Sequence, residues 1–92
     1  MNRTELRDAV AKETGLSGAE ADRVIAATFD TIGGALAARD KVALAGFGTF
    51  ETRERSARTG RNPQTGESME IAASTAPAFK PATALKRRVS EA

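Results

Sequence analysis

The sequence predicts an α+β protein with two N-terminal helices, antiparallel strands that carry a long protruding β-arm, and a C-terminal helix. Three observations support this class. Apolar residues recur at helical spacing through residues 1–40 and again near the end of the chain, and between these regions they alternate with a period of two. A long polar stretch separates the alternating segments, and a chain of 92 residues has the size of a single domain.

The first helix is predicted to begin in the segment "NRTE", where Asn2 precedes Glu5 by three positions. This is the spacing of a capping box, in which each residue satisfies a backbone N–H group of the other. Leu6 and Val10 belong to a short apolar stripe, and Gly15 provides a left-handed stop.

The second helix is predicted to begin with the same device, because Ser17 precedes Glu20 by three positions. An apolar stripe then follows, which makes the helix about 20 residues, or about 30 Å, long. The pair Gly33 and Gly34 interrupts it, either as a close-packing point against a partner or as a local weakness.

After residue 40 the apolar period changes to two, which indicates strands. Val42 and Leu44 begin the first strand, and residues 45–51, "AGFGTFE", are predicted to continue it. Glycine inside a strand marks a bulge or a close backbone approach, and Gly46 and Gly48 predict one of these.

The return strand is predicted to begin near Met69 and Ile71, where the alternation resumes. Residues 77–81, "PAFKP", are predicted to end the sheet with Phe79 facing the core. Residues 82–89 return to helical spacing and predict the last helix.

The eighteen residues 51–68 contain Ala57 as their only hydrophobic side chain. Because a strand lies on each side, the segment is predicted to be a two-stranded ribbon whose tip, residues 62–66, holds the turn pairs Asn-Pro and Thr-Gly. Residues 53–62 would extend about 30 Å at about 3.3 Å per residue. A lone two-stranded ribbon is marginally stable, so the arm is expected to be mobile until a ligand binds it.

The arm is rich in arginine and has a proline at its tip. Arginine on an extended ribbon suits a narrow groove lined with phosphates. Pro63 is either an ordinary turn former or an apolar wedge of the kind that minor-groove proteins insert between base pairs. The arginines and the lack of core residues favour the wedge. Residues 53–62 carry Arg53, Arg55, Arg58 and Arg61 against the single acid Glu54.

Composition limits the function further. Residues 1–52 hold six Lys/Arg and eight Asp/Glu, a net −2, whereas residues 53–92 hold eight and four, a net +4. This asymmetry indicates either a half that faces a polyanion or a solvated basic tail. Cysteine and histidine are absent, which removes disulfides, the usual zinc, iron and copper ligands and the commonest nucleophile–base pairs. We therefore expect no enzyme activity, metal or cofactor, and we expect oligomerisation to stabilise so small a core.

The N-terminal residues "MNRTELRDAV" are charged and contain no apolar signal-peptide region. No run approaches the roughly 18 apolar residues of a membrane helix. We expect a cytoplasmic protein that has no membrane partner.

Three segments, "GFGTF" (46–50), "RTGRNPQTGE" (58–67) and "PAFKP" (77–81), resemble signature segments of the HU/IHF family of bacterial histone-like DNA-bending proteins. The "NRTEL" start and the "GLS" between the first helices are similar too. The resemblance covers residues 1–89 and implies an intertwined homodimer with an IHF-like DNA-binding fold. It implies a helical dimerisation part at 1–40, a saddle of strands at 41–80 with its arm at about 53–74, and a C-terminal helix and tail at 81–92.

The same resemblance implies roles for individual residues. Pro63 corresponds to the intercalating residue of the family. The other implied DNA contacts are Arg53, Arg55, Arg58, Arg61, Asn62 and Gln64 on the arm and Arg3, Lys80 and Lys86 on the body, and the implied dimer core is Phe29, Phe47, Phe50 and Phe79.

The chain departs from the family pattern at a few positions. The family commonly has lysines where this chain has Gly18 and Ala19, and often a proline where it has Ala72. Its "PATALK", which includes Thr83, replaces a frequent "PGKALK". Each lost lysine removes a possible phosphate contact.

The expected function is sequence-tolerant binding and bending of double-stranded DNA by a nucleoid-associated homodimer, with a preference for bent, nicked or flexible DNA. One alternative is a subunit of a sequence-specific IHF-type heterodimer. Another is a protein-interaction module that uses the arm as a clasp. The sequence shows no paired acids in one motif and no phosphate-cradling glycine loop, so a small-molecule substrate is not expected. Base stacking on single strands is poorly supported because Tyr and Trp are absent.

Overall fold

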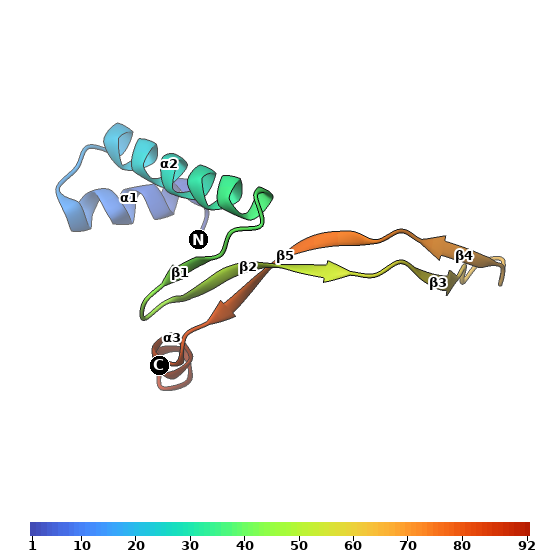
Figure 1. Ribbon diagram of the computed structural model, residues 1–92. Coiled ribbons are helices and arrows are strands. Elements are labelled where there is room, and N and C mark those ends of the chain that lie inside the picture. The colour runs from blue at the N-terminus through green and yellow to red at the C-terminus, as the bar shows by residue number, and fades with distance from the viewer. The chain divides into compact units, whose positions relative to one another are not determined.

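The computed structural model describes residues 1–92 and confirms the predicted α+β class (Figure 1). The chain forms two compact units, Met1–Gly34 and Ala35–Ala92. The elements in order are α1 (Arg3–Thr14), α2 (Gly18–Ala37), β1 (Val42–Leu44), β2 (Gly48–Arg55), β3 (Arg58–Arg61), β4 (Ser68–Ile71), β5 (Ser74–Pro81) and α3 (Thr83–Ser90).

Side-chain caps define the beginnings of the first two helices, as predicted. The Glu5 N–H donates to Asn2 Oδ1 at 2.8 Å, and the Asn2 N–H donates to Glu5 Oε1 at 3.4 Å, which completes the capping box of α1. Before α2, the Glu20 N–H donates to Ser17 Oγ at 3.1 Å, so Ser17 is the cap as predicted. The Glu20 carboxylate accepts from the Ser17 hydroxyl at 3.0 Å and not from the Ser17 N–H, so the second capping box is incomplete. Gly15 ends α1 in the left-handed region, with φ 75°.

The isolated chain buries very little apolar surface. Ala21 and Ile25, both on α2, are its only buried hydrophobic residues, and Phe29 on the same helix is 54% exposed. A small domain without disulfides or a metal usually needs more core than this, and a partner chain can supply it.

The sheet contains one more strand than the sequence predicts. Residues 45–51 do not continue the first strand. Instead, β1 ends at Leu44, the chain turns, and β2 returns antiparallel to it from Gly48. The Phe47 N–H donates to the Leu44 carbonyl oxygen at 3.0 Å across this turn, and Gly46 has φ 80°. Gly46 is therefore a turn residue and not a bulge, because its left-handed backbone lets the chain reverse.

Strand β2 lies between β1 and β5 in a three-stranded antiparallel sheet. Phe50 on β2 faces Phe79 on β5, and their ring centroids are 4.8 Å apart. The ring of Phe47, from the turn, lies 5.4 Å from that of Phe79. Phe47 and Phe79 nevertheless remain 46% and 38% exposed, so the aromatic cluster is not closed by its own chain.

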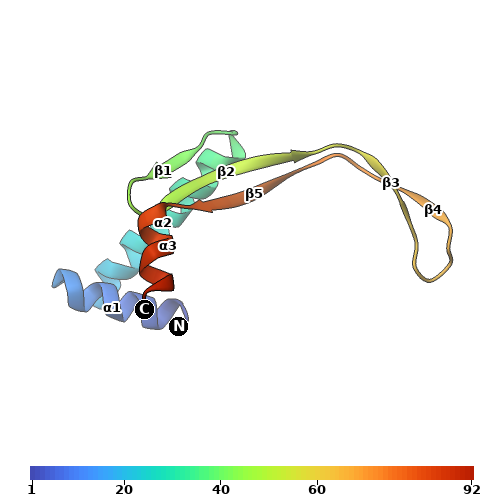
Figure 2. The same ribbon diagram turned by 90° about the horizontal axis from the view of Figure 1, so that it is seen from below.

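Strands β3 and β4 form a second, two-stranded sheet that continues beyond the ends of β2 and β5 as a narrow ribbon (Figures 1 and 2). We call residues 53–74 the arm. Arg55 faces Ser74 at the end of one sheet, and Arg58 faces Ile71 at the start of the other. Two residues on each strand separate these pairs. The interruption therefore contains no extra residue, and the register is the same on both sides.

Candidate nucleic-acid interface

The β2–β5 ribbon has two chemically different faces. Side chains alternate along a strand, so Arg53 and Arg55 share a face with Lys80, which is paired with Thr49. The opposite face carries the aromatic pair formed by Phe50 and Phe79. The three cations therefore point away from the aromatic cluster, and Glu51 is the only acid on their face. We call this surface the cationic face.

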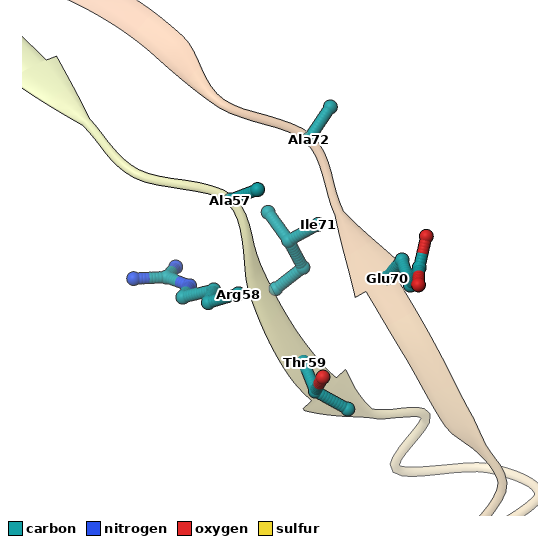
Figure 3. A pocket seen from close by; sticks show the side chains of 6 residues that line it. All are labelled: Ala57, Arg58, Thr59, Glu70, Ile71 and Ala72. Carbon is teal, nitrogen blue, oxygen red and sulfur yellow. The ribbon is translucent and has the colours of Figure 1, made fainter.

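The distal part of the arm is almost fully exposed. Arg58 and Arg61 on β3 are separated by an odd number of positions, which directs them to opposite faces of the ribbon. Figure 3 shows Arg58 extending outward from β3, Glu70 extending outward from β4, and Ile71 lying between the strands. A shallow hollow lies where the two sheets of the arm meet, and it is lined by Ala57, Arg58, Thr59, Glu70, Ile71 and Ala72.

The tip of the arm is an ordered turn that displays Pro63. The Asn62 N–H donates to the Glu67 carbonyl oxygen at 2.8 Å, and the Gly66 N–H donates to the Asn62 carbonyl oxygen at 2.7 Å. Asn62 Oδ1 accepts a further bond from the Gln64 N–H at 2.9 Å. This side-chain bond spans Pro63, so it holds the exposed proline in one orientation.

The Asn62 side chain is expected to order the tip before any ligand binds. In Asn62→Ala the backbone bonds remain, but the bond to the Gln64 N–H is lost, at a cost of about 1 kcal/mol to the local turn. Amide hydrogen exchange of the free protein should then show faster exchange at Gln64. Asn62→Asp keeps the acceptor and should keep the protection, so equal exchange in the alanine and aspartate variants would contradict this role.

The body residues named from the sequence lie on separate elements. Arg3 is not free in this structure, since its Nε lies 3.2 Å from Asp22 Oδ1 on α2. Lys86 is exposed on α3, next to Arg87 and Arg88. The structure thus joins Lys80 to the arginines of β2, whereas Arg3 lies on α1 in the other compact unit and Lys86 lies on α3.

Geometry and comparison with known proteins agree on the class of ligand. The cationic face and the exposed tip suit a phosphate-lined groove. The family model described as "Bacterial DNA-binding protein" matches residues 1–90. The chain belongs to the HU/IHF family. Members of this family are architectural DNA-binding proteins without enzymatic activity, which agrees with the function class predicted from the sequence.

HU proteins from several bacteria are similar over nearly the whole chain. The DNA-binding protein HU of Geobacillus stearothermophilus is 61% identical over 89 residues, which cover 97% of this chain and 99% of that protein. The DNA-binding protein HU 1 of Bacillus subtilis is 58% identical over 90 residues, 98% of each chain. These relatives confirm the resemblance that the three signature segments carry.

Solved HU structures have the same fold. The Anabaena HU–DNA cocrystal structure superposes with a TM-score of 0.93 at 47% identity and covers 100% of both chains. HU from Thermotoga maritima gives a TM-score of 0.68 at 32% identity, covering 97% of this chain and 98% of that one. The helices of the present HU/IHF chain include none that is long and apolar enough to cross a membrane.

Proposed function

We propose that a homodimer of this chain binds double-stranded DNA with little sequence preference and bends it, as a nucleoid-associated architectural protein in the cytoplasm. The observation that carries the proposal is the arm, an exposed ribbon with a cationic face at its base and an ordered Pro63 at its tip. The Anabaena relative was crystallised with DNA, and its chain superposes over the whole length of this one.

The proposed chemistry divides the arm into two tasks. Arginines along the ribbon neutralise phosphates and release counterions, which supplies affinity without reading the sequence. Pro63 enters the minor groove and separates two base pairs, which costs a few kcal/mol per step and is offset by the contacts that the bend permits. Nicked or flexible DNA lowers that cost, so such sites bind more tightly.

The exposed aromatic residues support a dimer. Phe29, Phe47 and Phe79 remain more than a third exposed in the isolated chain, although aromatic side chains usually contribute most to a core. Burial of these residues against a second copy accounts for the small core of the single chain. Native mass measurement of the protein purified alone tests this, and a monomer at micromolar concentration would overturn it.

Arg58 and Arg61 are expected to act as phosphate contacts. Each Arg→Ala change should reduce the slope of log K against log salt by about 0.9 per contact, or by about 1.8 in a homodimer. Arg23→Ala is the matched control, because it removes the same charge from an exposed position on α2 outside the interface. Binding isotherms at several salt concentrations measure the slope. Slopes equal to wild type in both arm variants would remove these arginines from the interface.

A further inference from the structure

Arg39 has an unusual backbone for its residue type. With φ 63° it is the only non-glycine residue in the left-handed region, at a position just after α2 where glycine is the ordinary choice. The Arg39 N–H donates to the Leu36 carbonyl oxygen at 3.0 Å, and the Asp40 N–H donates to the Ala35 carbonyl oxygen at 2.9 Å. The helix end therefore requires this conformation, and a side chain at residue 39 makes it less favourable.

The guanidinium of Arg39 makes contacts that a glycine could not make. Nη1 donates to the Ala37 carbonyl oxygen at 3.0 Å, and Nη2 donates to Thr75 Oγ1 at 3.2 Å. Nε lies 3.5 Å from Glu54 Oε1. The Thr75 hydroxyl in turn donates to the Glu54 carboxylate, with oxygen–oxygen distances of 2.9 and 2.8 Å. One arginine, one hydroxyl and one carboxylate thus form a closed triangle, which we call the arm-root triad.

The triad lies where the ribbon loses its third strand. Strand β1 accompanies β2 only as far as the pair of Val42 with Phe50, and beyond that pair β2 and β5 form a two-stranded ribbon. Glu54 and Thr75 face each other in this two-stranded part. Because such a ribbon is marginally stable alone, a lateral contact here has more effect on its order than one inside the sheet.

The triad lies on the face of the ribbon opposite the cationic face. By alternation, Glu54 lies on the face opposite Arg53 and Arg55. It is the only acid among residues 53–62, and its carboxylate is engaged by Arg39 and Thr75. Arg39 is thus directed toward Glu54, away from the cationic face.

We propose that Arg39 is a positioning residue for the arm. Its guanidinium ties Glu54 and Thr75, at the base of the ribbon, to the Ala37 carbonyl oxygen at the end of α2. The inference rests on the proposed DNA-binding function, because it is the direction of a DNA-binding arm that Arg39 sets. Arg39 itself contacts no phosphate. Its contribution is to order residues 53–55 and 74–76 before DNA arrives, which reduces the entropy lost on binding.

The test begins with Arg39→Gly, which removes the guanidinium and relieves the left-handed backbone, so the helix end is retained. Amide exchange of the free protein should become faster at residues 53–55 and 74–76 and stay unchanged within α2. Affinity for intact duplex should fall about two- to fivefold, the range expected of an exposed ion pair. The slope of log K against log salt should not change, whereas Arg23→Ala should alter neither arm exchange nor affinity.

A second variant tests whether the triad acts as a unit. Thr75→Val keeps the shape of the side chain but removes the hydroxyl, and the double variant with Arg39→Gly should lose no more affinity than Arg39→Gly alone. Unchanged arm exchange in Arg39→Gly, or a salt slope reduced by about 0.9 per subunit, would overturn the proposal. Absence of duplex binding by the wild type would instead reject the proposed function, and the exchange measurement on the free protein would still decide the role of Arg39.

Discussion

Replacement of Pro63 by alanine is expected to abolish most of the DNA bend and to remove the preference for nicked over intact duplex. The wild type should favour a nicked duplex, because a nick lowers the cost of separating base pairs at the two proline tips of a homodimer. Alanine is too small to hold the base pairs apart. The affinity for nicked duplex divided by the affinity for intact duplex should therefore fall toward one. We expect a fall of about tenfold, which corresponds to a loss of about 1.4 kcal/mol of discrimination between the two duplexes.

Two further substitutions separate the wedge from the turn. Pro63→Leu keeps an apolar side chain that can intercalate but loses the fixed φ of proline, so it should retain much of the bend. Thr65→Ala changes the same turn without touching the wedge and should behave like wild type. Fluorescence energy transfer between labelled duplex ends reports the bend. Equal bends and equal nick preference for Pro63→Ala and wild type would disprove the wedge.

Local chemistry explains which elements could be predicted from the sequence. The caps at Asn2 and Ser17 and the stop at Gly15 depend on residues within one helical turn, and all three were predicted correctly. The arm was predictable because residues 51–68 contain only Ala57 as a hydrophobic side chain, which is too little to hold the segment against a core. The turn after Leu44 was missed, because the apolar alternation continues through Gly46 while the backbone reverses.

In the candidate site, too, residues close together in the sequence could be predicted and contacts between distant residues could not. The arginines and Pro63 are visible in one short segment, and the resemblance to the family assigned their roles. No short segment of the sequence marks the arm-root triad. Arg39 and Thr75 are 36 positions apart, and they meet only when the residues after α2 fold beside β2 and β5. The left-handed backbone of Arg39 is likewise hidden, since nothing in the sequence marks an arginine as the residue that follows a helix end.

Gly48→Ala is expected to lower the stability of the protein more than the replacement of any other glycine by alanine. Gly48 is buried on the central strand, paired with Leu44 on one side and Pro81 on the other. A Cβ there would lie 2.5 Å from Phe79 Cζ and 2.7 Å from the Lys80 carbonyl oxygen. The ring of Phe79 can turn, but the carbonyl belongs to the sheet backbone, so β2 and β5 must separate. Overpacking of this kind costs about 1–3 kcal/mol.

Thermal unfolding at fixed protein concentration measures this effect, and Gly60→Ala provides the matched control. A drop of about 4–8 °C in Tm is expected for each kcal/mol lost in a domain of this size. At Gly60 an added Cβ would lie 2.8 Å from Ile71 Cδ1, the mobile end of an exposed side chain, which can move aside. Gly60→Ala should therefore stay within about 0.5 kcal/mol of wild type. The backbone carbonyl of Lys80 distinguishes the two sites, so equal Tm values for the two variants would show that β5 does not press against Gly48.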